Sequence, residues 1–178
     1  MDLWSEKLLG GKKKTVDWTS IGTLTSNGVL GQGEYAASSE PVATSGFDAY
    51  QAFNSISVSL ADITKVFRIT SSRSNNCKLI YYSAKPIYLS SFSFYFIQPE
   101  YGDVYQLSSG LLEASNDGNN WTTLLSGIPS YQDSSTPKLY TIDTKKGYKY
   151  FRLNLTAAAN QSCWWLIIAA ELKGKREV

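Results

Sequence analysis

The sequence contains no histidine, and only two cysteines and one methionine among its 178 residues. Without histidine, the chain cannot build a Ser-His-Asp or Cys-His arrangement from its own side chains. The two cysteines, Cys77 and Cys163, are too few for a metal framework, and no histidine can complete one. We expect free buried thiols, with a single disulfide as the alternative. These absences argue against an enzyme.

Long apolar runs are also missing from the first 18 residues, which are too polar for a signal peptide or a membrane span. We therefore expect a chain that is made in a cytosol. It then either stays there, leaves by another route such as cell lysis, or is an excised piece of a longer protein.

The chain also lacks an excess of positive charge. Seventeen Lys and Arg face fifteen Asp and Glu, which gives a net charge of +2. Basic residues gather only at 12–14 and in the last few positions, whereas nucleic-acid binding normally needs a dense basic stripe. We predict solvated terminal patches and no nucleic-acid partner.

What the chain does have is apolar and aromatic residues, at 43% and 13% of the sequence, with twelve Tyr and five Trp. This composition predicts one folded domain with a substantial core. Residues 1–16 read as an N-terminal arm or linker, and residues 17–178 as the domain. The arm is either loosely ordered or a segment for attachment or oligomerisation.

Residues 147–174 show the clearest strand pattern. Between 148 and 156, polar or tyrosine positions such as Arg152 and Asn154 alternate with Phe151, Leu153 and Leu155, which is the period of a strand with one buried face. Residues 164–172 are apolar at nearly every position, as in a strand buried on both faces. Residues 173–176 then read as a charged tail that ends the strand. We predict the closing pair of strands of an antiparallel domain.

Other runs at 65–70, 77–82 and 87–97 are rich in β-branched and aromatic residues, and polar turn clusters separate them. Many short strands with such turns indicate a sandwich or barrel. Asn116-Asp117-Gly118, between runs 111–115 and 121–125, predicts a hairpin, because Asp-Gly tolerates the positive φ of a tight turn.

Several segments in order resemble the discoidin domain, also called the coagulation-factor type C domain. YAASSE (35–40) and YQAFN (50–54) resemble "SASSE … YQAFDG", and LEASNDGNNWTTL (112–124) resembles the "SNDGxNWTTL" hairpin. YKYFRLN (148–154) is similar to "YRYYRLN", and IAAELKG (168–174) is similar to the closing "IAELELYG". The resemblance covers roughly residues 18–174. In style it is closest to versions in bacteriophage tail-fibre and bacterial proteins.

The resemblance implies a galactose-binding-like jelly roll, an all-β antiparallel sandwich of a five-stranded and a three-stranded sheet. Loops at one end of such domains bind a sugar, a lipid head group or a protein. We therefore expect a non-catalytic carbohydrate-binding module, a receptor-binding or accessory part of a phage tail (virion) or a bacterial cell-surface assembly. Copies on a homo-oligomer would add avidity. One alternative is a structural or adaptor protein that binds another virion or surface protein, and a further one is a glycan-processing enzyme.

A structural calcium site is also implied, because the family's "FDG" loop and closing Glu supply ligands. Here Asn54-Ser55 replaces Asp-Gly while Glu171 is kept, so we expect at most a weakened site at Asn54 and Glu171. The family tryptophan after that loop is absent, and Phe67 is expected to take its place in the core.

Candidate ligand-binding residues are aromatic and polar side chains near loops. Trp164 and Trp165 are adjacent on a strand and must face opposite sides of it. One of the two indoles can therefore be exposed, so that a sugar can stack on it. The sequence does not decide which of the two it is. The loop 98–106 mixes rings with carboxylates, a usual composition for a sugar site. The full candidate set is Trp164, Tyr101, Tyr105, Tyr131, Arg73, Glu100 and Asp103.

Two further residues are expected to be structural. Trp121 is predicted to pack in the core, and Arg152 to pair with a carboxylate or carbonyl rather than to reach a ligand. No pair among Glu100, Asp103, Glu113 and Glu171 is singled out by its spacing for glycoside hydrolysis, so no catalytic residue is predicted.

Overall fold

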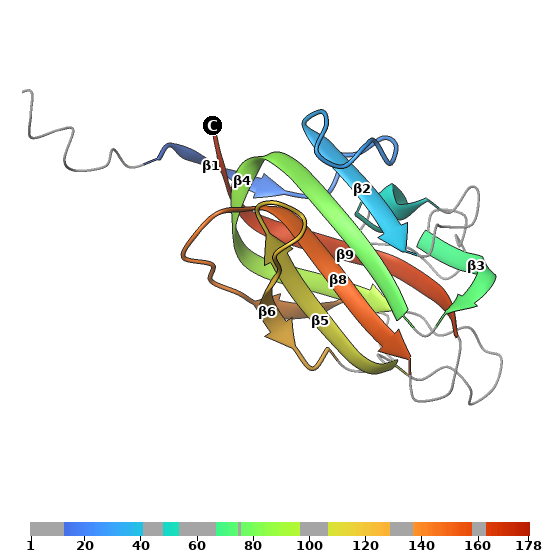
Figure 1. Ribbon diagram of the computed structural model, residues 1–178. Coiled ribbons are helices and arrows are strands. Elements are labelled where there is room, and N and C mark those ends of the chain that lie inside the picture. The colour runs from blue at the N-terminus through green and yellow to red at the C-terminus, as the bar shows by residue number, and fades with distance from the viewer. Residues whose placement is uncertain are drawn as a thin grey trace, which may run out of the picture.

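A computed structural model of the chain describes residues 13–40, 48–53, 67–74, 76–96, 107–128, 137–157 and 163–178 (Figure 1). Within these ranges the chain is almost entirely β-strand, and every strand pairing is antiparallel. The elements are β1 (Thr15–Thr19), β2 (Tyr35–Glu40), the 3₁₀ helix η1 (Ala49–Phe53), β3 (Phe67–Ser74), β4 (Asn76–Phe96), β5 (Leu107–Ser115), β6 (Thr122–Ser126), β7 (Lys138–Thr141), β8 (Tyr148–Ala157) and β9 (Cys163–Glu177). The predicted all-β antiparallel class is confirmed.

Strand β4 runs through both layers of the sandwich and joins them. Its first part pairs with β2 and β8, and β8 continues through β5 to β6, which makes a five-stranded layer. Its second part pairs with β7 and β9, and β1 and β3 follow one another along the other edge of β9. The register shifts between Tyr82 and Ile87, where the strand passes from one layer to the other. The runs predicted at 77–82 and 87–97 are therefore two parts of one strand.

The core lies between the two layers and takes alternate residues of their strands. In β8, Phe151, Leu153 and Leu155 are buried while Arg152 and Asn154 are partly exposed, so the predicted alternation is confirmed. The second part of β4 contributes apolar side chains from the opposite layer to the same cluster. Phe67 is fully buried, which confirms its predicted place in the core.

Strand β9 is longer than the sequence indicates. Residues 173–176, which we expected to form a charged tail, belong to the strand, and the strand ends at Glu177. The expectation was wrong because β1 pairs with residues 173–177 on one edge while β4 pairs with residues up to 176 on the other. Alternating charge is compatible with a strand whose outer face meets water.

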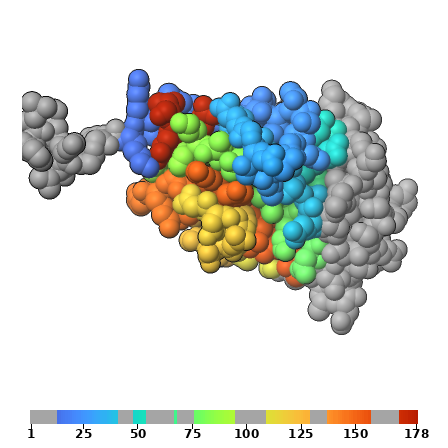
Figure 2. Space-filling model, turned by 45° about the horizontal axis from the view of Figure 1, so that its top comes forward, coloured from blue at the N-terminus to red at the C-terminus, as the bar shows by residue number. Residues whose placement is uncertain are grey.

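The two described ends of the chain are therefore joined. The backbone N–H of Val178 donates to the carbonyl of Lys14 (3.1 Å), and the Lys13 ammonium lies 2.8 Å from the Glu177 carboxylate. Strand β1 begins at Thr15, among the last residues of the predicted arm. The blue β1 segment and the red end of β9 lie side by side on the surface (Figure 2).

The hairpin between β5 and β6 forms where Asn116-Asp117-Gly118 predicts it. Gly118 has a φ of 74°, the left-handed conformation that glycine adopts without strain. The Asp117 carboxylate accepts the backbone N–H groups of Asn119 (2.8 Å) and Asn120 (2.7 Å), which closes the turn.

Cys77 is a free thiol in the core, and burial raises its pKa well above the ordinary range of a thiol. Of the two alternatives for the cysteines, the free buried thiol is the one found at this position. No helix among the described residues is long and apolar enough to cross a membrane.

Candidate functional site: a depression over β1, β9 and β4

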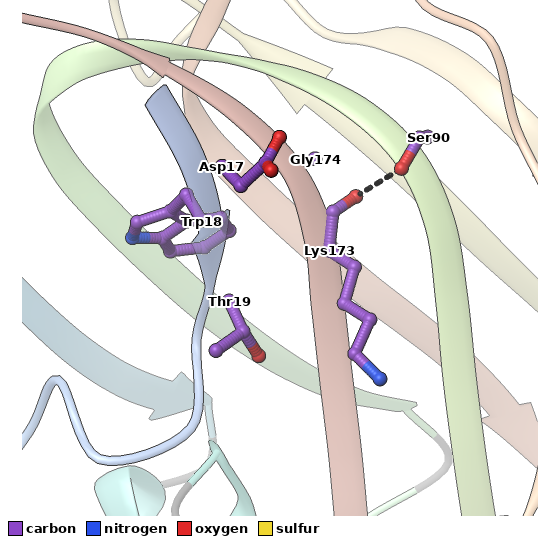
Figure 3. A pocket seen from close by; sticks show the side chains of 6 residues that line it. All are labelled: Asp17, Trp18, Thr19, Ser90, Lys173 and Gly174. Atoms are coloured by element: carbon purple, nitrogen blue, oxygen red, sulfur yellow. Dashed lines mark hydrogen bonds between the residues drawn. The ribbon is translucent and has the colours of Figure 1, made fainter. Parts of the chain in front are cut away.

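A shallow depression of about 400 Å³ lies over three neighbouring strands, where the order is β1, β9, β4 (Figure 3). Strand β1 contributes Asp17, Trp18 and Thr19, β9 contributes Lys173 and Gly174, and β4 contributes Ser90. Its volume falls in the range of small-molecule sites, although it is open rather than enclosed.

A β-bulge lies at the depression. Leu89 pairs with Gly174 and Ser91 pairs with Lys173, so Ser90 is an extra residue in β4. Its hydroxyl donates to the Lys173 carbonyl (3.1 Å). A Cβ on Gly174 would overlap the Tyr88 carbonyl oxygen, so only glycine permits this close approach of β4 and β9. Bulges often re-aim side chains next to binding sites.

The charge of the depression is set by an ion pair at its edge. The Lys173 ammonium lies 3.0 Å from Glu171 Oε1, and the Thr19 hydroxyl donates to the same oxygen (2.9 Å). Glu171 is only 3% exposed. The exposed Asp17 carboxylate makes no ion pair with any residue in the part of the chain that the structure describes. Lys175 stands directly opposite Asp17 in the register of β1 and β9, so the depression has charges of both signs.

Hydrogen-bond directions give the depression its chemistry. Because the hydroxyls of Ser90 and Thr19 donate to protein oxygens, what they can still offer to a ligand is their acceptor lone pairs. The Asp17 carboxylate is an acceptor as well. Together with the remaining N–H donors of the Lys173 ammonium, these acceptors suit a polar ligand rich in hydroxyl groups.

Trp18 does not provide a free stacking plate here. Its indole points away from Lys173 (Figure 3) and packs toward Tyr35 and Tyr81, with ring centroids 6.4 and 5.7 Å apart. Burial raises the pKa of Tyr81, whose hydroxyl lies 2.7 Å from that of Thr23. This aromatic cluster holds β1 against the core. The depression therefore offers hydrogen bonds without ring stacking.

The side chains of the sequence-based ligand residues are not among those that the structure describes. Tyr101, Tyr105, Tyr131, Glu100 and Asp103 fall outside the described residues. Trp164 and Arg73 lie on β9 and β3, where the backbone is described and their side chains are not. Ser74 pairs with Cys163, so the neighbouring positions Arg73 and Trp164 are brought to the same end of the β3–β9 ladder. These assignments stay predictions.

Of the two residues expected at the implied calcium site, Glu171 is the one that the structure describes. Asn54 lies outside the described residues. Glu171 Oε1 already accepts a hydrogen bond from the Thr19 hydroxyl and pairs with the Lys173 ammonium. A positively charged neighbour does not suit a bound cation. The part of the chain that the structure describes holds no group of three or more His, Cys, Asp or Glu that could bind a metal ion.

On the outer face of the five-stranded layer, Arg152 is structural, as expected. Its Nε donates to Glu113 Oε2 (2.8 Å), to which Asn154 also donates (3.2 Å). The predicted core position of Trp121 is wrong: the indole is half-buried beneath the Arg152 guanidinium, whose carbon lies 4.0 Å from the ring centroid. The indole N–H is satisfied by the Gly118 carbonyl (3.1 Å) within the hairpin, so the ring needs no core partner.

Asp17, Ser90 and Lys173 were not singled out by the sequence. Their convergence depends on a bulge and on a strand order that joins distant segments, and neither has a local signal. Gly174, a glycine inside a strand, was the one usable sign of a close backbone approach.

Two antiparallel layers joined by a shared strand, with the hairpin and closing strands where the resemblance puts them, define a discoidin-like, galactose-binding-like β-sandwich. The chain has this fold, so the predicted resemblance is confirmed at the level of the fold. No protein-family model matches the sequence, and no curated protein matches it.

Three examples illustrate the solved structures that are similar to this chain in fold. The family 32 CBM, a carbohydrate-binding module, from C. perfringens NanJ in complex with galactose has a TM-score of 0.55 at 14% identity, covering 78% of this chain and 93% of that one. A chitosan-binding module derived from a chitosanase/glucanase of Paenibacillus sp. IK-5 has a TM-score of 0.57 at 17% identity, covering 82% and 96%. The F5/8 type C domain of a Bacteroides fragilis protein has a TM-score of 0.52 at 17% identity, covering 81% and 93%.

Proposed function

We propose that the protein is a non-catalytic glycan-binding module. The observation that carries the proposal is its fold, which is similar to that of modules whose names state galactose and chitosan binding. The chain spans nearly the whole length of these modules, and its lack of histidine removes the usual nucleophile–base arrangements. Because one neighbour derives from a chitosanase/glucanase, a module of this kind can also serve a catalytic partner.

Within this proposal, the main sugar contact is expected at the candidate residues Trp164, Tyr101 and Tyr105, where an aromatic ring can stack on a pyranose. The depression would be a weaker, accessory contact, because its acceptors match sugar hydroxyls but no ring faces it.

The finer part of the proposal is biological. We place the module in a phage tail or a bacterial surface assembly, where it would recognise a cell-surface polysaccharide. A single open site binds weakly, so copies on a homo-oligomer would be needed for tight attachment.

A glycan array with the full chain tests the proposal. We expect binding to a defined group of glycans, lost in Trp164→Ala or Tyr101→Ala and weakened in Asp17→Asn. Asp143→Asn, an exposed carboxylate on a different segment, is the matched control and should bind as the wild type does. An array without any specific signal would overturn the proposal, and turnover of a bound glycan by purified protein would revive the enzyme.

The adaptor alternative has one supporting observation. Val16 and Val178 are 43% and 53% exposed, and the β1–β9 ladder brings them to the same end of the domain. Exposed apolar side chains at one place favour contact with another protein. If no glycan on the array binds, and residues 1–16 bind a virion protein tightly, this alternative is favoured.

A further inference from the structure

We propose that the Lys173 ammonium takes the place of a calcium ion at Glu171, so that this β-sandwich is held together at that point by its own side chains. The proposal concerns the stability of the fold and does not depend on what the domain binds.

The first argument is burial. Glu171 lies in β9 between the buried Ala170 and Leu172 and is only 3% exposed, whereas Lys173, two positions on, is exposed. A carboxylate removed from water to this degree needs a compensating charge or several donors. The requirement is met within the chain, because Lys173 is close enough to pair with it.

The second argument is geometry. Glu171 Oε1 accepts the Thr19 hydroxyl at 2.9 Å and lies 3.0 Å from the Lys173 ammonium. Calcium binds carboxylate oxygens at about 2.3–2.6 Å. An ion on this oxygen would bring its charge against the ammonium, so the ammonium and the ion are alternatives.

The third argument is charge. Against the family pattern, the chain has Asn54 where a carboxylate is usual, which removes one negative charge. It also has Lys173 where the closing "IAELELYG" has tyrosine, which adds one positive charge. Of the two differences, Lys173 is the one that the structure places at Glu171, where its positive charge offsets the carboxylate.

The ion pair lies where β1 joins β9. Next to Thr19, the buried Ser20 exchanges two hydrogen bonds with Leu172: its backbone N–H donates to the Leu172 carbonyl (2.9 Å), and its hydroxyl accepts the Leu172 N–H (3.0 Å). Thr19 and Glu171 therefore continue a connection between the first and last described strands. The Lys173 ammonium stabilises this connection by neutralising its one buried charge.

Thermal unfolding of the full chain in CaCl2 and in EDTA tests the proposal directly. We expect the same Tm in both. An ion present at a hundred times its Kd would raise the Tm of a domain this size by about 5–10 °C. A saturable rise in Tm with calcium that is absent in magnesium would overturn the proposal.

Lys173→Met and Lys175→Met form a matched pair of variants. Both lysines are exposed on β9, two positions apart and on the same face, and both substitutions keep an aliphatic side chain. Lys173→Met should lower the Tm by about 4 °C or more, because it leaves a buried carboxylate unpaired. Lys175→Met should change it by about 1 °C or less. Equal effects of the two substitutions would contradict the proposal.

Addition of Glu171→Gln to the Lys173→Met variant separates the charge from the packing. The neutral amide should restore part of the lost Tm, because the unpaired charge is then gone. Absence of any recovery in a folded double variant would overturn the charge argument. If the double variant does not fold, the paired lysine variants and the calcium comparison still decide.

Discussion

At the scale of single residues, Arg152 connects side chains from three parts of the fold. Its guanidinium pairs with Glu113 and covers one face of Trp121, so three side chains from β8, β5 and the hairpin loop support one another. A structural partner for Arg152 was predictable, since a strand arginine among aromatic residues must be satisfied. Its identity was not, because Glu113 is 39 positions away and meets it only through the register of β5 and β8.

Arg152→Met should lower the free energy of unfolding by about 2–4 kcal/mol, because it leaves the buried Glu113 carboxylate without its cation. The two side chains are only 16% and 11% exposed. Lys78→Met breaks the exposed pair with Glu40 and should cost about 1 kcal/mol or less. Urea denaturation of both variants checks the difference, and comparable losses would mean that the Arg152 pair contributes no more than a surface contact.

Asp117 is a second residue with a measurable signature. Backbone and side-chain hydrogen bonds from Asn120, then from Asn119 and Ser115, lower the pKa of its carboxyl below the usual range. The folded pKa is thus below the unfolded value of about 3.9. Its stabilisation of the hairpin is complete above that value and is lost as pH falls through the folded pKa. A carboxyl-carbon NMR titration should give Asp117 a midpoint below the unfolded value of about 3.9, whereas a midpoint at that value would contradict the hydrogen-bond pattern.

At the scale of elements, the bulge in β4 and the glycine opposite it act together. Gly174→Ala would bring a methyl group into the Tyr88 carbonyl, which is backbone and cannot turn aside. We expect a loss of about 2–3 kcal/mol or more, with faster amide exchange along residues 87–91. Gly22→Ala has a positive φ but open space around it, and should cost only about 1–2 kcal/mol of backbone strain. If the two variants lose the same free energy of unfolding, backbone strain accounts for both losses, and the close approach of β4 and β9 at Gly174 adds nothing.

Some of these elements could be predicted from local sequence patterns, and others could not. Period-2 alternation predicted the buried face of β8, and Asp-Gly predicted the β5–β6 hairpin, because both signals are local. The end of β9 was missed, since lysines and a glutamate gave no local reason to stay extended. Only pairing with β1 on one edge and β4 on the other keeps these residues in a strand. The depression was missed for the same reason.

At the scale of the molecule, the first and last described strands stabilise each other. Deletion of residues 175–178 removes the partners of residues 15–17 in β1 and of Ile87 and Tyr88 in β4. Hydrogen exchange should then rise at both places, while the β5–β6 hairpin stays protected. Deletion of Val178 alone, which removes a single hydrogen bond to Lys14, is the control and should have little effect. Unchanged protection of β1 in the longer deletion would mean that the aromatic cluster around Trp18 holds the strand by itself.

The antiparallel β1–β9 ladder also determines how the domain responds to force. Thr15 pairs with Glu177, so a load applied between Lys13 and Val178 acts on both strands at the same end of the ladder. Its hydrogen bonds would then break one after another, as in a zipper, instead of resisting together as they do in shear. Pulling from one of these ends against a point on the opposite side of the sandwich would avoid this weak direction, because the tension would then pass through the body of the domain.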